Sequence, residues 1–385
     1  MASASLPLTL GIIGGGQLAR MTAIAAAPLG IRVSVLHPSD DCPAAPVSQV
    51  FVGKWTERDD LEAWAKTVDV VTLEHEFVAA ADLSWLTQQG HSVWPSGATL
   101  ELIQDKWRQR SHLLQAGLPV PTFRAIESLA GLKSTQREWD GPLVVKTRRL
   151  GYDGHGTAIA RKPDELESIW QMFCLDGSEA ADTLMVEEFI PFERELAVMV
   201  ARRRNGDCVC YPVTETVQKN YVCDRTITPA PIPQELRQEA EAVAIAAVQA
   251  VESVGVVGVE LFLTESGDVL VNELAPRPHN SGHYTLNGCV TSQFEQHVRA
   301  VLDLPLGSTE LLAPSVVMAN VLGTRDSDCR GILLAGVLQE PDTYLHWYGK
   351  ADNRLGRKLG HVNAIADTPE LAIERAERAR QSLDV

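Results

Sequence analysis

With 385 residues, 45% of them hydrophobic, the chain is long enough for two or three domains with a sizeable core. Its formal net charge of −16 argues against general binding to nucleic acid or anionic membranes, but leaves room for a local basic pocket that takes a phosphorylated metabolite. The seven cysteines are scattered, the N-terminus lacks a signal-peptide pattern, and no apolar run approaches the ~20 residues of a membrane span. These features predict a cytoplasmic protein with reduced thiols.

The first hundred residues alternate short apolar runs with helical stretches. Strands are predicted at 8–13, 31–36, 68–73 and 93–94, with helices at 21–27, 59–66 and 80–88. Such alternation is typical of a parallel sheet covered by helices, so residues 1–103 are predicted to form a Rossmann-like domain.

A glycine turn follows the first predicted strand. Gly14-x-Gly16-x-x-Ala19 nominally fits the dinucleotide fingerprint, which also needs an acidic residue about 20 positions further on to hold the ribose. The second strand instead ends at His37-Pro38, so a nicotinamide-dependent oxidoreductase is disfavoured. A helix that begins behind glycines still offers N–H groups to a phosphate.

Two acidic residues flank a histidine where the third strand ends, in the sequence Glu74-His75-Glu76. Open α/β sheets bind ligands at the carboxyl edge of their strands, so these side chains are candidate ligand contacts. The alternative is ordinary exposed charge at the end of a strand.

The second domain is predicted to begin near residue 104. Residues 104–117 have the pattern of an amphipathic helix, and Pro119 and Pro121 behind it mark a boundary.

A strand that carries Lys146 runs into a loop with Gly151, Gly154 and Gly156. Three glycines in six residues let backbone N–H groups approach phosphate oxygens. The loop is not a Walker motif, because Gly-Lys-Ser/Thr is absent, and an ordinary glycine turn is the alternative.

Residues 258–283 carry the pattern of a metal site. Two apolar strands with a predicted two-residue turn at Ser266-Gly267 would place Glu260 opposite Glu273. Carboxylates there would repel, so a cation should lie between them, and Mg²⁺ fits. The proline-stiffened, donor-rich loop at 276–283 favours a metal and anion site over the alternative, a hairpin with both glutamates in solvent.

The last third of the chain begins with an Ala-rich helix predicted at 233–253, and later contains a strand at 315–322 and an amphipathic helix at 369–383. Between these two lies a basic cluster, which is a local anomaly in so acidic a chain. Arginine forks suit a phosphomonoester, and a solvated basic hairpin is the alternative. The cluster consists of Lys350, Arg354, Arg357, Lys358 and His361.

Six segments together resemble one enzyme family. They are GGGQLAR, KTRRLGYDGHG, GVELF, NELAPRPHNSGH, HWYGK and GRKLGH, which begin at positions 14, 146, 258, 272, 346 and 356. They are similar to motifs of the N5-carboxyaminoimidazole ribonucleotide synthetase family of the ATP-grasp superfamily. The resemblance implies an α/β ATP-grasp fold with three domains: a Rossmann-like (preATP-grasp) domain at 1–103, an ATP-grasp domain of two subdomains at 104–312, and a small β-rich domain at 313–385.

The resemblance also implies an activity. Members of the family use bicarbonate and MgATP to carboxylate 5-aminoimidazole ribonucleotide in purine biosynthesis, and release ADP and phosphate by way of carboxyphosphate. Relatives are commonly dimers, so a homodimer is expected, with small-molecule substrates and without nucleic-acid or membrane partners.

A nucleotide site is implied by the same motifs. Lys146 is expected to contact ATP phosphate, the glycine loop to cover the triphosphate, residues 187–190 to meet adenine through backbone groups, and Glu195 to take the ribose. Mg²⁺ is expected on Glu260 and Glu273. The full set of expected ATP contacts is Lys106, Lys146, Gly151, Tyr152, Asp153, Gly154, His155, Gly156, Thr157, Glu187, Glu188, Phe189, Ile190, Glu195, Gln218, Asn272 and Glu273.

Roles in the carboxylation follow from the resemblance as well. Asp153 would orient or deprotonate the amine, Arg277 and the 279–281 loop would hold bicarbonate and carboxyphosphate, and Lys350 would contact the reactants. The expected catalytic residues are Asp153, Arg277, His279 and Lys350. The expected ribonucleotide contacts are Gly16, Gln17, Leu18, Glu74, Glu76, Tyr152, Asn280, Ser281, Lys350, Arg354 and Arg357.

The chain departs from the family pattern at Ala19, Thr216 and Gln218, and the last departure puts a nucleotide contact in doubt. Ala275 replaces an asparagine common in the superfamily, so metal binding rests on two carboxylates. A formate-using glycinamide ribonucleotide transformylase shares the architecture and is the alternative enzyme, and a non-catalytic nucleotide sensor is the alternative from another class.

Overall fold

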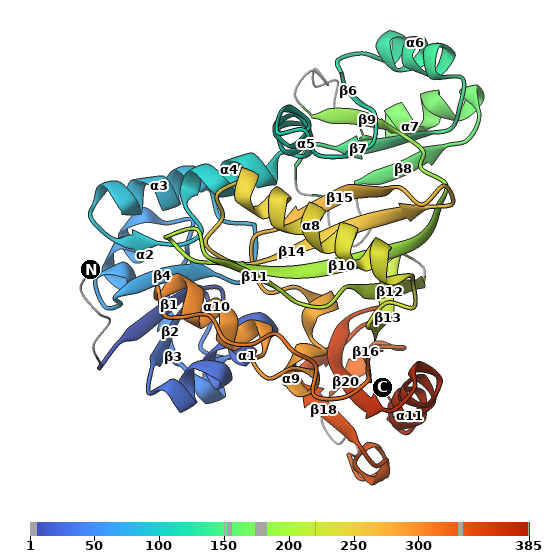
Figure 1. Ribbon diagram of the computed structural model, residues 1–385. Coiled ribbons are helices and arrows are strands. Elements are labelled where there is room, and N and C mark those ends of the chain that lie inside the picture. The colour runs from blue at the N-terminus through green and yellow to red at the C-terminus, as the bar shows by residue number, and fades with distance from the viewer. Residues whose placement is uncertain are drawn as a thin grey trace.

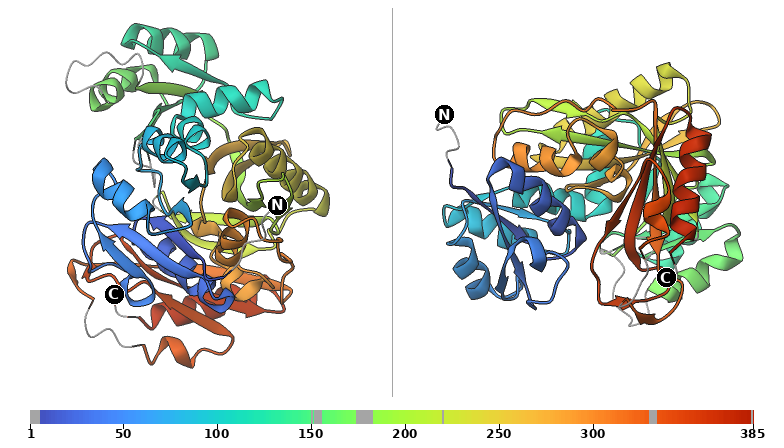
Figure 2. Two further views of the ribbon diagram at one scale, coloured as in Figure 1. Left: turned by 90° about the vertical axis from the view of Figure 1, so that its left-hand side faces the viewer. Right: turned by 90° about the horizontal axis from the view of Figure 1, so that it is seen from below.

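The computed structural model describes residues 6–149, 151, 156–173, 183–219, 221–329, 334–383 and 385. They form an N-terminal unit, a small lobe and a large central sheet (Figure 1). The small lobe stands at one end of the molecule, and the N-terminal unit and the C-terminal strands lie at the other (Figure 2). No helix among the described residues is long and apolar enough to span a membrane.

The N-terminal unit is a five-stranded parallel sheet of order β3-β2-β1-β4-β5, which confirms the Rossmann-like prediction. The three inner strands, at 9–13, 32–37 and 70–73, are almost wholly buried. Gly11 leaves room for the ring of Trp64, which a Cβ would approach within 2.8 Å. The elements are β1 (Thr9–Ile13), α1 (Gln17–Ala26), β2 (Arg32–His37), β3 (Gln49–Val52), α2 (Arg58–Ala65), β4 (Val70–Leu73), α3 (Ala80–Gln88) and β5 (Ser92–Val93).

The helix predicted at 104–117 begins at Lys106, so the predicted start at residue 104 was wrong. The structure has two helices, α4 (Gly97–Gln104) and α5 (Lys106–Gln115), separated at Asp105. The Asp105 carboxylate accepts hydrogen bonds from the backbone N–H groups of Trp107 and Arg108, both at 3.1 Å, and pairs with buried Arg148 at 2.6 Å. An N-cap residue needs non-helical backbone, so the chain bends here and starts a new helix with Lys106.

The small lobe is an antiparallel sheet of order β6-β9-β7-β8 backed by two helices. Leu132, Leu166 and Ile169 of the helices pack on its buried face. The elements are β6 (Phe123–Ile126), α6 (Leu129–Trp139), β7 (Leu143–Thr147), β8 (Thr157–Ala160), α7 (Leu166–Phe173) and β9 (Leu184–Glu188).

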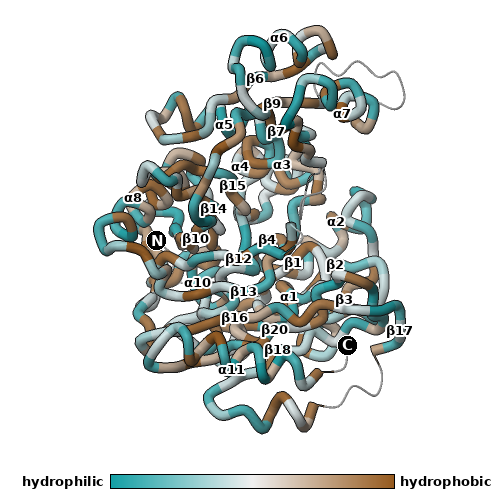
Figure 3. Tube along the Cα trace, turned by 90° about the vertical axis from the view of Figure 1, so that its right-hand side faces the viewer, coloured by the Kyte–Doolittle hydropathy of each residue, from teal (hydrophilic) through white to brown (hydrophobic). Residues whose placement is uncertain are grey.

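The central sheet has nine strands and runs without interruption into the C-terminal part of the chain. Figure 3 shows the path β15-β14-β10-β12-β13-β16-β20-β18. The ninth strand, β11, pairs with β10. The strands are β10 (Phe192–Arg202), β11 (Cys208–Cys210), β12 (Thr214–Lys219), β13 (Val222–Thr228), β14 (Gly255–Thr264), β15 (Val269–Ala275), β16 (Ser315–Leu322), β18 (Thr343–Trp347) and β20 (Lys358–Ala366); β17 (Ser327–Asp328) pairs with β19 (Asp352–Asn353) apart from it.

Helices cover the central sheet through small side chains. The Ala-rich helix α8 (Gln234–Ala250) packs Ala240, Ala244 and Ala247 on one face of β10 and β14, as its pattern predicted. Because strand side chains alternate, the opposite face of these strands is left for Glu195 and Glu260. The remaining helices are α9 (Thr285–Gly288), α10 (Gln293–Val301) and α11 (Pro369–Gln381).

A buried histidine of α10 links the N-terminal unit to the central sheet. His297 Nδ1 accepts a hydrogen bond from the N–H of Val256 at 3.1 Å, so its Nε2–H donates to Thr72 Oγ1 at 2.9 Å. Burial lowers the pKa of His297 to about 4. The bond from Val256 therefore requires the neutral imidazole, because protonation of Nδ1 removes the acceptor.

Acidification should weaken this link. The pKa of His297 is about 4 in the folded protein and about 6.5 in the unfolded chain, so the unfolded chain binds the additional proton first. The free energy of unfolding therefore falls as the pH drops from about 6.5 to about 4. For this histidine the fall is at most about 1.4 kcal/mol per pH unit. His297→Gln keeps an acceptor and a donor without a titrating group. We expect the variant to lose less unfolding free energy than the wild type between about pH 7 and about pH 5 in urea titrations, and equal losses would contradict this.

Candidate active site

A cavity of about 1380 Å³ opens where the N-terminal unit, the small lobe and the central sheet meet. Most of the residues predicted to bind ligands line it, although they come from distant parts of the sequence. The predicted residues that line it are Gln17, Leu18, Glu74, Glu76, Lys106, Lys146, Gly151, Thr157, Glu187, Glu188, Phe189, Ile190, Glu195, Gln218, Glu260, Asn272, Glu273, Arg277, His279, Asn280 and Ser281.

Glu260 and Glu273 are paired across β14 and β15, as predicted. They reach this register by a different route, because the turn has three residues between Thr264 and Asp268, with Gly267 at φ +90°, and a β-bulge at Asn272 shifts the ladder back by one. The predicted two-residue turn was therefore wrong, and the bulge compensates for the difference.

The two carboxylates differ in their electrostatic surroundings. Burial, Glu273 and Glu195 raise the pKa of Glu260 to about 7, although its side chain remains 33% exposed toward the cavity. Glu273 has Lys106 Nζ at 2.6 Å; burial opposes its ionisation, but Lys106 lowers the pKa overall.

Two accessible carboxylates on neighbouring strands fit a hard divalent cation. No cluster of three or more His, Cys, Asp or Glu side chains that could hold a metal exists within the described part of the chain. A Mg²⁺ ion would therefore take most of its ligands from water and from a phosphate substrate, as Mg²⁺ sites commonly do.

Cations from helix α5 and strand β7 gather beside this pair. Lys146 Nζ lies 2.5 Å from Glu187 Oε2, and Arg110 Nε lies 2.7 Å from the other oxygen of Glu187. Burial favours the neutral form of Glu187, but Arg110 and Lys146 lower its pKa to about 2. Burial lowers the pKa of Lys146. The arrangement holds the Lys146 ammonium at the cavity wall next to Lys106.

The segment expected to meet adenine lies in β9 and the turn behind it. The N–H groups of Glu188 and Phe189 donate to the carbonyls of Thr122 and Pro142, at 2.9 and 3.2 Å. These two N–H groups are thus engaged within the protein. A backbone contact with adenine would have to use other backbone groups of residues 187–190.

An aromatic pair that the sequence analysis missed lines the same region. The rings of Phe192 and Phe262 are stacked, with centroids 4.7 Å apart and planes 6° apart. Phe262 follows Glu260 by two positions, so it shares the face of β14 that carries the predicted metal carboxylate. This alternation along the strand was the signal in the sequence that could have placed Phe262 in the site. The pair provides a flat apolar wall suited to a planar base.

Glu195 and Gln218 meet beside this wall. Burial raises the pKa of Glu195, and a hydrogen bond with the Gln218 side chain opposes the rise. Gln218 is therefore joined to a predicted ribose contact in spite of its departure from the family pattern.

Glu74 closes the N-terminal side of the cavity. Its carboxylate accepts hydrogen bonds from the N–H groups of Gly16 at 2.5 Å and Ala19 at 3.0 Å, at the start of α1. A Cβ on Gly16 would lie 2.6 Å from this carboxylate, which explains the glycine. Glu74 thus occupies two of the helix N–H groups that were predicted to meet a phosphate, and Gly16 itself does not line the cavity.

The donor loop after β15 connects the units. Arg277 Nε lies 2.9 Å from Glu76 Oε2, and Asn280 exchanges two hydrogen bonds, of 2.9 and 2.8 Å, with buried Asn320 of β16. His279 Nδ1 lies 2.7 Å from Ser281 Oγ. Burial, together with Arg277 and Lys358, lowers the pKa of His279 to about 3. His279 is therefore a neutral hydrogen-bonding group at physiological pH.

Comparison with known proteins accounts for this set of units. Residues 8–104 match the ribonucleotide synthetase preATP-grasp domain, residues 111–294 the ATP-grasp domain, and residues 316–375 the phosphoribosylaminoimidazole carboxylase C-terminal domain. The N5-carboxyaminoimidazole ribonucleotide synthase of Synechococcus elongatus is 43% identical, over 97% of this chain and 93% of its own. The chain belongs to the N5-carboxyaminoimidazole ribonucleotide synthetase family.

Solved structures of the family agree with the fold. A crystal structure of an ADP complex of N5-carboxyaminoimidazole ribonucleotide synthetase is similar, with a TM-score of 0.88, 37% identity and 98% of both chains covered. The Aspergillus clavatus enzyme, solved with ADP and 5-aminoimidazole ribonucleotide, gives a TM-score of 0.86 at 31% identity, over 97% of this chain and 98% of that one. The ATP-grasp fold predicted from the motifs is confirmed.

The family's C-terminal basic motifs lie partly outside the cavity. Lys350 Nζ donates to the carbonyl of Lys358 at 2.7 Å, and burial and Arg357 lower its pKa to about 8. Arg354 and Arg357 both pair with Asp352. None of the predicted residues Lys350, Arg354 and Arg357 lines the cavity, whereas Lys358, which was given no role, does.

The segment that matches the family's phosphate loop is described only at its two ends. Tyr152, Asp153, Gly154 and His155 lie outside the described residues. On either side of them, Gly151 and Thr157 line the cavity. Gly156 adopts φ +78°, and its carbonyl accepts a hydrogen bond from the N–H of Thr147 at 2.8 Å.

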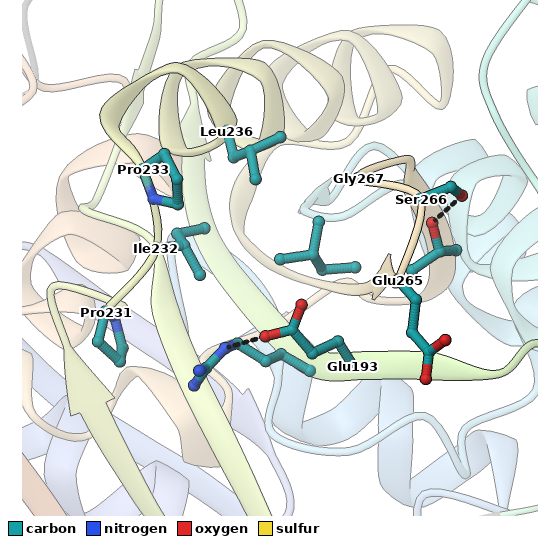
Figure 4. Close-up of a pocket in the computed structure, with 11 residues that line it drawn as sticks. Glu193, Pro231, Ile232, Pro233, Leu236, Glu265, Ser266 and Gly267 are labelled. Carbon is teal, nitrogen blue, oxygen red and sulfur yellow. Dashed lines mark hydrogen bonds and ion pairs between the residues drawn. The ribbon is translucent and has the colours of Figure 1, made fainter.

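A second pocket of about 280 Å³ lies at the far end of the hairpin, beside the start of α8 (Figure 4). Arg194 in its wall is already paired, because it contacts Glu193 at 3.3 Å and Glu215 at 2.8 Å. None of the predicted site residues lines this pocket, so the larger cavity is the candidate active site.

Proposed function

We propose that the protein carboxylates the exocyclic amine of 5-aminoimidazole ribonucleotide, using bicarbonate and MgATP and releasing ADP and phosphate. The observation that carries the proposal is one cavity that joins paired carboxylates, two lysines and the donor loop of residues 276–283. Membership of the family supplies the substrate class. The protein is also proposed to act in the cytoplasm, as a homodimer.

Glu260 and Glu273 would hold Mg²⁺, which supplies charge neutralisation for the phosphates when bound. Lys106 and Lys146 face the same space and would contact the phosphate oxygens. The stacked pair of Phe192 and Phe262 would pack against the base. The resulting site performs little covalent chemistry itself, since phosphoryl transfer depends on positioning and on electrostatic stabilisation.

In the proposed sequence, a bicarbonate oxygen attacks the γ-phosphorus of ATP and ADP leaves, which gives carboxyphosphate. Carboxyphosphate breaks down to CO₂ and phosphate, and the amine attacks CO₂ with loss of a proton. Arg277 and the neutral His279 would bind the bicarbonate and carboxyphosphate oxygens, and their hydrogen bonds to neighbouring residues would fix the donors in place. The domains proposed for these tasks are those expected from the sequence, 1–103, 104–312 and 313–385.

The first experiment is to measure ADP release with Mg²⁺, ATP and bicarbonate, with and without 5-aminoimidazole ribonucleotide, while following loss of the free aminoimidazole. Release that requires and consumes the ribonucleotide supports the proposal. Release that ignores it, or no release, contradicts the substrate assignment, and glycinamide ribonucleotide with formate is then the next pair to test.

Asp153→Asn tests the base assigned by the family motif. The amide keeps the size of the side chain but cannot accept the proton of the amine, so kcat should fall by about 10²-fold or more while ATP binding changes little. Steady-state kinetics with each substrate varied would measure this. Unchanged turnover would remove Asp153 from the chemistry.

A further inference from the structure

Arg110 is a buried arginine with contacts in two parts of the molecule. The helix that carries it, α5, lies between the small lobe and β15 (Figure 1), and Arg110 is 2% exposed. Its Nε donates to Glu187 Oε1 at 2.7 Å, and its Nη1 donates to the carbonyl of Val271 at 2.9 Å. Nη2 lies 3.4 Å from Asn272 Oδ1. Arg110 itself does not line the cavity.

The first region that Arg110 contacts is the β-bulge, which sets the register of Glu260 and Glu273, the proposed metal ligands. Leu261 pairs with Val271 and Glu260 pairs with Glu273, so Asn272 is the additional residue. Without the bulge, a shift of one residue would bring Asn272 opposite Glu260 and turn Glu273 to the other face.

Groups around α5 support the bulged strand from its outer edge. The Val271 carbonyl accepts from Arg110, the Val271 N–H donates to the carbonyl of Pro119 at 2.8 Å, and the Leu274 N–H donates to Gln109 Oε1 at 3.2 Å. A bulge interrupts the ladder locally, so these bonds replace backbone pairing that β15 lacks on this side.

The second contact region is Glu187, the partner of Lys146. One Glu187 oxygen accepts from Arg110 and the other lies 2.5 Å from Lys146 Nζ. A planar guanidinium with fixed donors can join the carboxylate and the bulge at once, and a lysine, with a single ammonium group, would reach both less well.

We propose that Arg110 is a positioning residue that aligns the Glu273 carboxylate and the Lys146 ammonium for a magnesium-bound nucleoside phosphate. The inference rests on the proposed MgATP site. It adds that a side chain outside the cavity couples the metal carboxylate to the phosphate-binding lysine.

The test compares Arg110→Met with Arg108→Met, which removes an exposed arginine two positions away on the same helix, paired with Glu101 at 2.7 Å. ADP affinity is measured calorimetrically with and without Mg²⁺. We expect the gain in affinity that Mg²⁺ gives to shrink about 10- to 100-fold in Arg110→Met and to stay unchanged in Arg108→Met. In the nucleotide-free protein, amide hydrogen exchange of residues 271–274 should accelerate only in Arg110→Met.

The outcomes separate this inference from the proposed function. A wild-type protein whose ADP affinity does not respond to Mg²⁺ contradicts the proposed MgATP site. A wild-type response that persists in folded Arg110→Met, with unchanged exchange at 271–274, overturns the role of Arg110. If Arg110→Met does not fold, Arg110→Lys keeps the charge, and the same two measurements decide: a partial loss supports the role and wild-type values overturn it.

Discussion

Glu260→Gln is expected to lower turnover by about 10²- to 10³-fold, with a rise in the Mg²⁺ concentration needed for half-maximal rate. The substitution preserves the shape of the side chain but removes one of the two carboxylates that face each other across β14 and β15. Glu273 is already paired with Lys106 at 2.6 Å, so it cannot replace the missing charge. Turnover at saturating ATP and ribonucleotide, measured over a Mg²⁺ titration, would show both effects.

The matched control is Glu265→Gln, which changes an exposed glutamate in the turn of the same hairpin. It should leave the Mg²⁺ titration unchanged.

The wild type should also bind Mg²⁺ more tightly as the pH rises from about 6 to about 8, because Glu260, with a pKa of about 7, must lose its proton to bind the metal. Glu260→Gln should lose this pH dependence. A variant with wild-type turnover and an unaltered Mg²⁺ requirement would contradict the assignment.

Local patterns predicted the pairing of the two glutamates on the hairpin. The alternation of apolar residues on two strands placed Glu260 opposite Glu273, because side-chain direction along a strand follows a period of two. The predicted pairing nevertheless agrees with the structure only because two departures from the predicted hairpin cancel. The turn is one residue longer than predicted, and the bulge at Asn272 restores the register. A bulge is stabilised by neighbours that are distant in sequence, here Arg110 and Pro119, and no local pattern reveals them.

The same limit explains the other differences. Asp105 ends one helix and caps the next because Arg148, 43 positions away, holds its carboxylate. Arg354 and Arg357 were expected at a substrate phosphate, yet both pair with Asp352 and neither lines the cavity. The composition of a segment predicts which charges are available, but their partners depend on how distant segments pack.

Glu187→Gln is expected to lower the free energy of unfolding. The Glu187 carboxylate is the shared partner of Arg110 and Lys146, and its side chain and that of Arg110 are each 3% exposed. Removing one partner of a buried ion pair leaves an uncompensated charge away from water, which typically costs about 3–5 kcal/mol of unfolding free energy. We expect a loss of this order in urea unfolding followed by tryptophan fluorescence, with Trp139 and Trp170 of the small lobe among the reporters.

A surface pair in the same lobe provides the comparison, because Glu138 and Arg124 lie 2.8 Å apart with 56% and 41% of their side chains exposed. Glu138→Gln should hardly change the urea midpoint, since solvent screens exposed pairs. The double variant Arg110→Met with Glu187→Met should recover part of the loss, because apolar side chains of similar volume tolerate burial better than an unpaired charge. If Glu187→Gln were no less stable than Glu138→Gln, the buried cluster would not stabilise the small lobe. The cluster would then serve only to position Lys146 and the Glu273 carboxylate.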